Sequence, residues 1–115
     1  MEAKQIAASA MQIIIKSGEG RSNTYRAIDA VHAGDFAKAA ELIKEANQGI
    51  KAAHIVHTEM IQSEAGGEEF GYSMLFSHAQ DTLMTAYSEF RLVKKLLPTL
   101  ESFDARLRAL EATDE

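Results

Sequence analysis

The residues best suited to chemistry are His78 and Asp81, which lie about one helical turn apart. Ser77, Gln80 and Thr82 lie close to the histidine, and their hydroxyl and amide groups donate hydrogen bonds to anions. A neutral imidazole is a good nucleophile toward phosphoryl groups. The sequence has no glycine-rich ATP loop with its lysine, so a phosphoryl group on His78 would have to come from an activated donor. Spacing alone leaves a second interpretation open, in which His78 is only a solvated residue.

The stretch from Gly71 to Ser88 carries one formal charge, that of Asp81, and is too apolar for a free surface helix. Residues three or four apart form a row along it: Met74, Ser77, Asp81, Met84 and Ser88. This spacing is typical of a second helix contact, so we expect self-association through the row. Copies of Asp81 would then meet around a symmetry axis and hold a divalent metal through oxygen ligands. The alternative is an Asp81 that faces solvent.

The other histidines favour structural roles. His57 occupies an apolar seam, where we expect a core-edge residue hydrogen-bonded to its surroundings. His54 and His57 have the spacing of half a metal site, but no third ligand accompanies them at a suitable spacing. His32, next to Gly34, is expected to be a cation-capable residue at a helix end.

The chain is long enough for one domain, which we assign to residues 1–115. A single proline and many Ala, Leu, Glu and Lys residues favour helix over sheet. Glycines at positions 34, 66 and 67 divide the chain into three long segments. Short connections make successive helices antiparallel, so we predict an all-α, up-down-up three-helix bundle.

Heptad spacing predicts the buried faces. The second segment repeats every seven residues: Phe36, Ile43, Ile50 and His57, with Ala39, Ala46, Ala53 and Met60 at the matching offset. The third segment does the same: Phe76, Leu83, Phe90 and Leu97, with Ala79, Ala86, Val93 and Leu100. Asp35 is the predicted N-cap of the second helix.

Two interruptions are expected. Gly18 and Gly20 predict a bend or a loosened turn within the first segment, which spans about residues 2 to 32. Pro98 predicts a kink or a local break in the third helix. The apolar pattern continues beyond that proline at Leu100, Phe103, Leu107 and Leu110.

Charge and composition exclude several classes of function. The net charge is -5 and the chain contains no block of Lys and Arg, so it lacks the electrostatic footprint of a nucleic-acid-binding protein. It contains no cysteine, which removes disulfides and thiol chemistry. It shows neither a signal-peptide pattern nor an apolar run long enough to span a membrane, so we expect a cytoplasmic protein.

The segment His78-Ala79-Gln80-Asp81-Thr82-Leu83-Met84 resembles the lactose/cellobiose-type enzyme IIA of the bacterial phosphoenolpyruvate-dependent sugar phosphotransferase system. The resemblance covers roughly residues 2 to 103. It includes Gly20-Arg21-Ser22, Gly34-Asp35-Phe36, the stretch from Ala53 to Thr58, and Ile61-Gln62-Ser63-Glu64-Ala65-Gly66-Gly67-Glu68. The chain departs from the family at two positions, with Thr82 where a second histidine is usual and His57 where glutamine is common.

The resemblance implies a phosphotransferase that acts as a histidine phosphocarrier. His78 would accept a phosphoryl group from phospho-HPr and pass it to a cysteine of the IIB component, while the membrane component IIC binds the sugar. The resemblance also implies a homotrimer with copies of Asp81 around a metal ion, for which we expect structural magnesium. Gln80 and Thr82 are the expected phosphoryl-stabilising residues. Lactose, cellobiose and chitobiose all stay open as the transported sugar.

Two other classes compete with the phosphocarrier. A non-catalytic helical adaptor would bind a partner helix through the apolar face of the third helix. A metal-dependent enzyme is a weaker alternative, because the carboxylates and histidines lack a compact ligand pattern.

Overall fold

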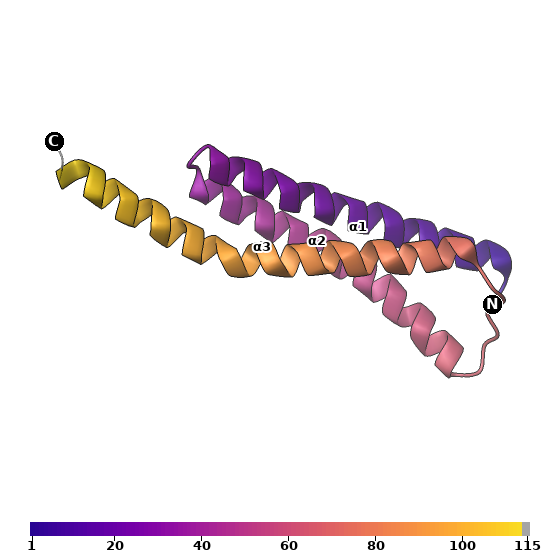
Figure 1. The fold of residues 1–115 in the computed structure, drawn as a ribbon. Helices are drawn as coiled ribbons and strands as arrows, with labels where there is room; N and C mark the ends of the chain where they lie inside the picture. Colours follow the sequence, from indigo (N-terminus) through magenta and orange to yellow (C-terminus); the bar gives the residue numbers. More distant parts are fainter. Residues whose placement is uncertain (114–115) are drawn as a thin grey trace.

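The computed structural model describes residues 1–113, and this part of the chain consists of three α-helices with no strand. The helices are α1 (Ala3–His32), α2 (Phe36–Ala65) and α3 (Met74–Thr113). They form an elongated, antiparallel up-down-up bundle (Figure 1). The predicted all-α three-helix architecture is therefore confirmed.

A tight turn reverses the chain between α1 and α2. Gly34 has a φ of 75°, a left-handed conformation that suits glycine because it has no Cβ. The Asp35 carboxylate then accepts a hydrogen bond of 3.0 Å from the backbone N–H of Lys38. This bond satisfies one of the free N–H groups at the start of α2, so the predicted N-cap is confirmed.

The core lies along the seams that heptad spacing predicts. In α3 the buried residues are Ala79, Leu83, Ala86, Phe90 and Leu97. In α2 they are Ala39, Leu42, Ile43, Ala46, Gly49, Ile50, Ala53 and Met60. Five residues of the predicted seams are only partly buried: Phe36, His57, Phe76, Val93 and Leu100. The many alanines at these positions let the helix backbones approach closely.

The predicted bend at Gly18 and Gly20 is wrong, because α1 continues as one helix through both residues. A Cβ on Gly20 would lie 2.9 Å from the Ile50 side chain and 3.0 Å from the Ala46 carbonyl oxygen. A Cβ on Gly49 would lie 2.9 Å from the Lys16 carbonyl oxygen. Gly20 and Gly49 therefore allow α1 and α2 to touch backbone to backbone, which explains why the sequence accepts the helix-propensity cost of glycine here.

Pro98 lies inside α3, which bends in the orange part of the ribbon in Figure 1 and continues to Thr113. A proline within a helix cannot donate to the carbonyl four residues earlier, and its ring clashes with that carbonyl. The predicted kink is confirmed, and the structure shows that the segment after Pro98 is helical, which the sequence left open. Beyond Pro98, α3 extends past the turn between α1 and α2, and its apolar side chains become exposed.

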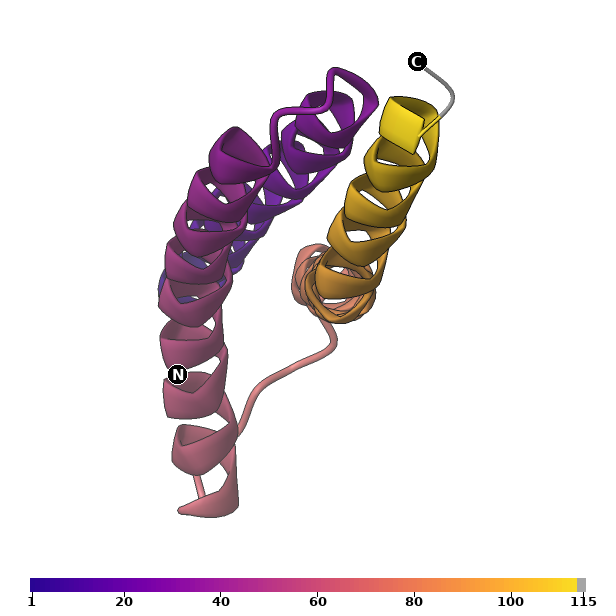
Figure 2. The same cartoon turned by 90° about the vertical axis from the view of Figure 1, so that its left-hand side faces the viewer.

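The connection between α2 and α3 is extended, and Figure 2 shows it crossing from the end of α2 to α3. The N-terminal amine pairs with the Glu68 carboxylate at 2.9 Å and donates to the Glu69 carbonyl at 3.1 Å. These contacts hold the connection against the start of α1. Within the described residues, no helix combines the length and apolarity needed to cross a membrane.

Candidate functional site

His78 lies in the second turn of α3 and is exposed. Among residues 1–113 no side chain hydrogen-bonds to its ring. Its neighbour Ala79 is fully buried in the core, so the helix is fixed under the histidine while the ring itself reaches solvent. This arrangement presents an accessible imidazole on a rigid element.

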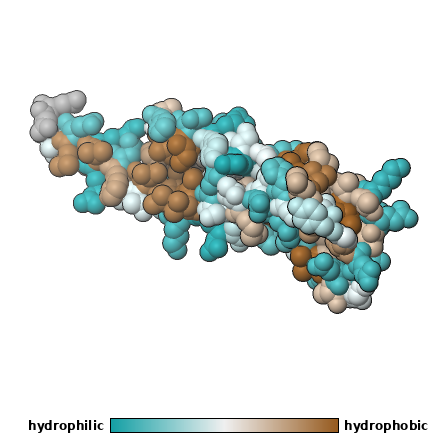
Figure 3. Space-filling model, turned by 45° about the vertical axis from the view of Figure 1, so that its right-hand side comes forward, coloured by the Kyte–Doolittle hydropathy of each residue, from teal (hydrophilic) through white to brown (hydrophobic). Residues whose placement is uncertain are grey.

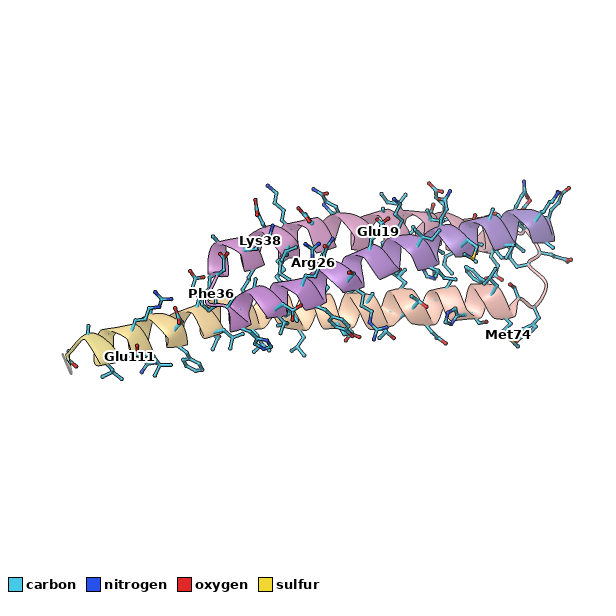
Figure 4. All side chains as sticks on the ribbon, turned by 90° about the horizontal axis from the view of Figure 1, so that it is seen from above. Glu19, Arg26, Phe36, Lys38, Met74 and Glu111 are labelled. Atoms are coloured by element: carbon cyan, nitrogen blue, oxygen red, sulfur yellow. The ribbon has the colours of Figure 1, made fainter. Side chains whose placement is uncertain are left out.

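Asp81 and the rest of its row face away from the core. Every member is exposed: Met74, Ser77, Asp81, Met84 and Ser88. Met74, at the start of α3, is 73% exposed and lies on the side turned away from α1 and α2 (Figure 4). The structure thus confirms that the row is an unpartnered face within one chain.

One chain by itself does not form a metal site. Within residues 1–113, no group of three or more His, Cys, Asp or Glu side chains is arranged to hold a metal ion. Asp81 contributes one carboxylate to the exposed face. The predicted ion would therefore need Asp81 residues from several copies of the chain.

Thr82 lies one turn beyond His78, where its hydroxyl donates a 2.8 Å hydrogen bond to the His78 carbonyl oxygen. Threonine commonly makes this bond to the preceding helical turn. The hydroxyl proton is therefore directed along the helix. To donate to a phosphoryl group on His78, Thr82 must change its side-chain rotamer.

Gln80 lies on the other side of α3 from His78, because two residues are separated by about 200° around a helix. Its amide nitrogen is 3.0 Å from the Nε2 atom of His57 on α2. The two predicted phosphoryl-stabilising residues thus occupy opposite flanks of α3 within one chain. The two-residue spacing of His78 and Gln80 already implies this separation once the segment is a helix.

His57 is a half-buried residue between α2 and α3. Its ring stacks on Phe76, with centroids 6.1 Å apart and an interplanar angle of 20°. Burial lowers the pKa of His57, and the charge of nearby His54 lowers it further. A neutral His57 accepts the amide hydrogen of Gln80 through Nε2. The prediction of a hydrogen-bonded core-edge histidine is confirmed.

A cationic hollow beside this site was not predicted. It has a volume of about 730 Å³ and is lined by His54, Met84, Tyr87, Ser88, Arg91, Leu92 and Lys95. The Arg91 guanidinium lies over the Tyr87 ring, 5.4 Å from its centre. The sequence signal for it was the pair of cations Arg91 and Lys95, which are four residues apart on one face of a helix in an acidic chain.

The family profile described as the lactose/cellobiose-specific IIA subunit of the PTS system matches residues 8–101. The oligo-beta-mannoside-specific EIIA component of Bacillus subtilis is 42% identical over 86 residues, which are 75% of this chain and 78% of that protein.

Two solved structures share the fold. The cellobiose-specific enzyme IIA of Bacillus anthracis is 36% identical, with a TM-score of 0.81 over 91% of this chain and 94% of that one. The IIA(chitobiose) structure from its Escherichia coli complex with HPr is 31% identical, with a TM-score of 0.72 over 90% of this chain and 98% of that one. The chain therefore belongs to the lactose/cellobiose-specific IIA family of the sugar phosphotransferase system.

Proposed function

We propose that this chain is a phosphocarrier in which His78 accepts a phosphoryl group from phospho-HPr and passes it to a cysteine of the IIB component. The observation that carries the proposal is the exposed, unbonded His78 ring in a sequence motif of the family. The E. coli relative forms a complex with HPr, which supports HPr as the donor.

The chemistry requires two displacements at phosphorus. A ring nitrogen of neutral His78 attacks the phosphoryl group, a P–N bond forms, and the bond to the donor breaks. The IIB thiolate then attacks the same phosphorus, a P–S bond forms, and the P–N bond breaks. The phosphoryl group is conserved in both steps. The sugar would be bound by the membrane component IIC, so this chain would affect it only indirectly.

The exposed row on α3 supports a homotrimer. It presents Met74 and Met84, which are 73% and 51% exposed, on both sides of Asp81. A threefold axis along this row would bury the methionines and bring three Asp81 carboxylates together. Carboxylate oxygens fit a hard divalent cation, so we propose that Asp81 holds a structural magnesium ion that offsets the repulsion among the copies.

The same symmetry gives Gln80 a role beside His78. In a parallel threefold arrangement, the flank of α3 that carries His78 faces the flank of the next copy that carries Gln80. Gln80, held by His57 at 3.0 Å, would thus approach the phosphohistidine of the neighbouring copy. Thr82 would donate from the same chain after a rotamer change.

Phosphorylation of the purified chain distinguishes this function from a helical adaptor. Incubation with phosphoenolpyruvate, enzyme I and HPr should add one acid-labile, base-stable phosphate per chain. His78→Ala should add none, whereas His32→Ala, which removes another exposed histidine, should behave as wild type. A wild-type chain that stays unmodified while HPr is phosphorylated would instead indicate the adaptor.

A further inference from the structure

The cationic hollow between α2 and α3 has the size and the lining of a small-molecule site. Its volume of about 730 Å³ lies within the usual range of such sites, about 300–1,000 Å³. His54 lines it from α2, and the other lining residues belong to α3. The hollow differs from the hydrophobic surface that Figure 3 shows beside the grey C-terminal residues, because it combines apolar side chains with cations and hydroxyl groups.

Two cations of the hollow lack a carboxylate partner. Arg91 and Lys95 lie four residues apart, on one face of α3. Among residues 1–113, no ion pair joins either of them to an Asp or Glu side chain, and no Asp or Glu lines the hollow. In a chain of net charge -5, these neighbouring positive charges favour an anion from outside the chain.

Aromatic contacts orient the guanidinium of Arg91. It lies over the Tyr87 ring, 5.4 Å from the ring centre. The Tyr87 ring in turn meets the edge of the His54 ring, with centroids 5.4 Å apart and an interplanar angle of 65°. Because each group is held by the next, the N–H donors of Arg91 are positioned before a ligand arrives, which lowers the entropy cost of binding.

The two cations fit a phosphate monoester. A guanidinium donates two parallel hydrogen bonds to phosphate oxygens, and an ammonium group adds a compact positive charge. A phosphate monoester carries about 1.5 to 2 negative charges at pH 7. It therefore matches Arg91 and Lys95 together, whereas a single carboxylate would leave one of the two charges uncompensated.

The rest of the hollow fits a sugar, because a phosphate group fills only a small part of about 730 Å³. The hydroxyl groups of Ser88 and Tyr87 and the ring nitrogens of His54 can bond to sugar hydroxyls. Among residues 1–113, these groups take part in no other hydrogen bond. Met84 and Leu92 add apolar surface for the C–H groups of a sugar.

We infer that the cationic hollow is a binding site for a sugar phosphate, whose phosphate group lies on Arg91 and Lys95. The site is separate from the proposed nucleophile, because Arg91 lies about 20 Å along the helix from His78, at a rise of about 1.5 Å per residue. The inference goes beyond the proposed function and does not depend on phosphoryl transfer to His78.

The hollow adjoins the face through which we propose that copies associate. Met84 and Ser88 line the hollow and also belong to the exposed row on α3. A neighbouring copy would therefore close one side of the hollow. Binding is tested on the assembled protein, so a neighbouring copy that fills the hollow would count against the inference.

Isothermal titration of the unphosphorylated protein with glucose 6-phosphate measures the binding. Free glucose and inorganic phosphate are titrated separately. Glucose 6-phosphate should bind at least about tenfold more tightly than either, because it alone reaches both the cations and the remaining donors. No binding of glucose 6-phosphate would overturn the inference. Inorganic phosphate that binds as tightly would show an anion site without sugar recognition and would also overturn it.

Matched substitutions test the location of the site. Arg91→Gln and Lys95→Gln each remove one cation of the hollow and should weaken binding of glucose 6-phosphate at least about tenfold. Arg26→Gln on α1 and Lys44→Gln on α2 make the same changes at exposed positions outside the hollow, so they should bind as the wild type does. Equal affinities in all four variants would place the ligand elsewhere and overturn the site.

Nuclear magnetic resonance of the ¹⁵N-labelled wild type gives a second measure of location that needs no substitution. Glucose 6-phosphate should shift the backbone amide signals of residues 84–95 and leave those of the turn between α1 and α2 in place. Amide shifts that leave out residues 84–95 would contradict binding in the hollow.

Discussion

His78 and His57 place the same imidazole group in two different surroundings beside α3. His78 is exposed and its ring has no hydrogen-bond partner among residues 1–113, whereas His57 is half-buried, stacked on Phe76 and bonded to Gln80. A nucleophile needs a free nitrogen that an incoming phosphorus atom can reach. The exposure of His78 therefore fits the nucleophile that we propose, and the contacts of His57 fit a positioning role.

The largest expected effect concerns Asp81, which shares the exposed face with His78. If three Asp81 carboxylates bind a divalent ion, chelator should shift the wild type toward monomers. Asp81→Leu removes the repulsion and adds apolar volume, so it should stay trimeric in chelator. Light scattering at micromolar concentration measures both. A wild-type trimer that chelator does not affect would contradict the metal-bridged axis.

The next largest effect is a difference between His57 and His78 in how much each contributes to the free energy of unfolding. His57→Ala removes the stacking on Phe76 and the partner of Gln80, so it should lower the free energy of unfolding by about 1–3 kcal/mol. His78→Ala, at an exposed position, should change it by less than about 0.5 kcal/mol. Urea unfolding followed by circular dichroism at one protein concentration gives both values. Equal losses would remove the distinction between the two surroundings.

The fold was more predictable from sequence than the site. The seams followed from apolar residues at helical spacing, because burial of one face is what holds a helix in a bundle. The contact of Gly20 with α2 was not foreseen, since it depends on how two helices are rotated against each other. The same rotation brings His57 to Gln80. Local spacing carries no information on such pairs.

His57 should also give the protein a pH-dependent stability. Its pKa lies below 6.5 in the folded chain, chiefly because of burial, so the unfolded chain binds more protons as the pH falls through that range. Stability should therefore decrease as the pH falls from 7 toward the lowered pKa of His57. His57→Gln, which removes this titrating group, should flatten the slope relative to the wild type. The measurement is a set of unfolding curves between about pH 5.5 and 7.5, at steps of roughly half a pH unit. If the wild type and His57→Gln show the same change of stability with pH, the pH dependence does not come from His57.

The smallest effect is expected at Thr82, whose hydroxyl donates to the His78 carbonyl in the unphosphorylated chain. If it turns to the phosphoryl group, Thr82→Val should shorten the phosphohistidine lifetime by up to about tenfold. Thr85→Val, one turn away on α3, serves as the matched control. The phosphohistidine lifetime is measured as the loss of ³²P from the chain at neutral pH. If Thr82→Val and Thr85→Val both have the lifetime of the wild type, Thr82 does not stabilise the phosphoryl group.

The location of the phosphate tests the central claim most directly. Cleavage after glutamate separates residues 46–59, which contain His54 and His57, from residues 70–89, which contain His78. The wild-type chain is phosphorylated through enzyme I and HPr, cleaved at mildly basic pH and analysed by mass spectrometry. The phosphate is predicted on the 70–89 peptide, at His78. Phosphate on the 46–59 peptide, with 70–89 unmodified, would contradict the account.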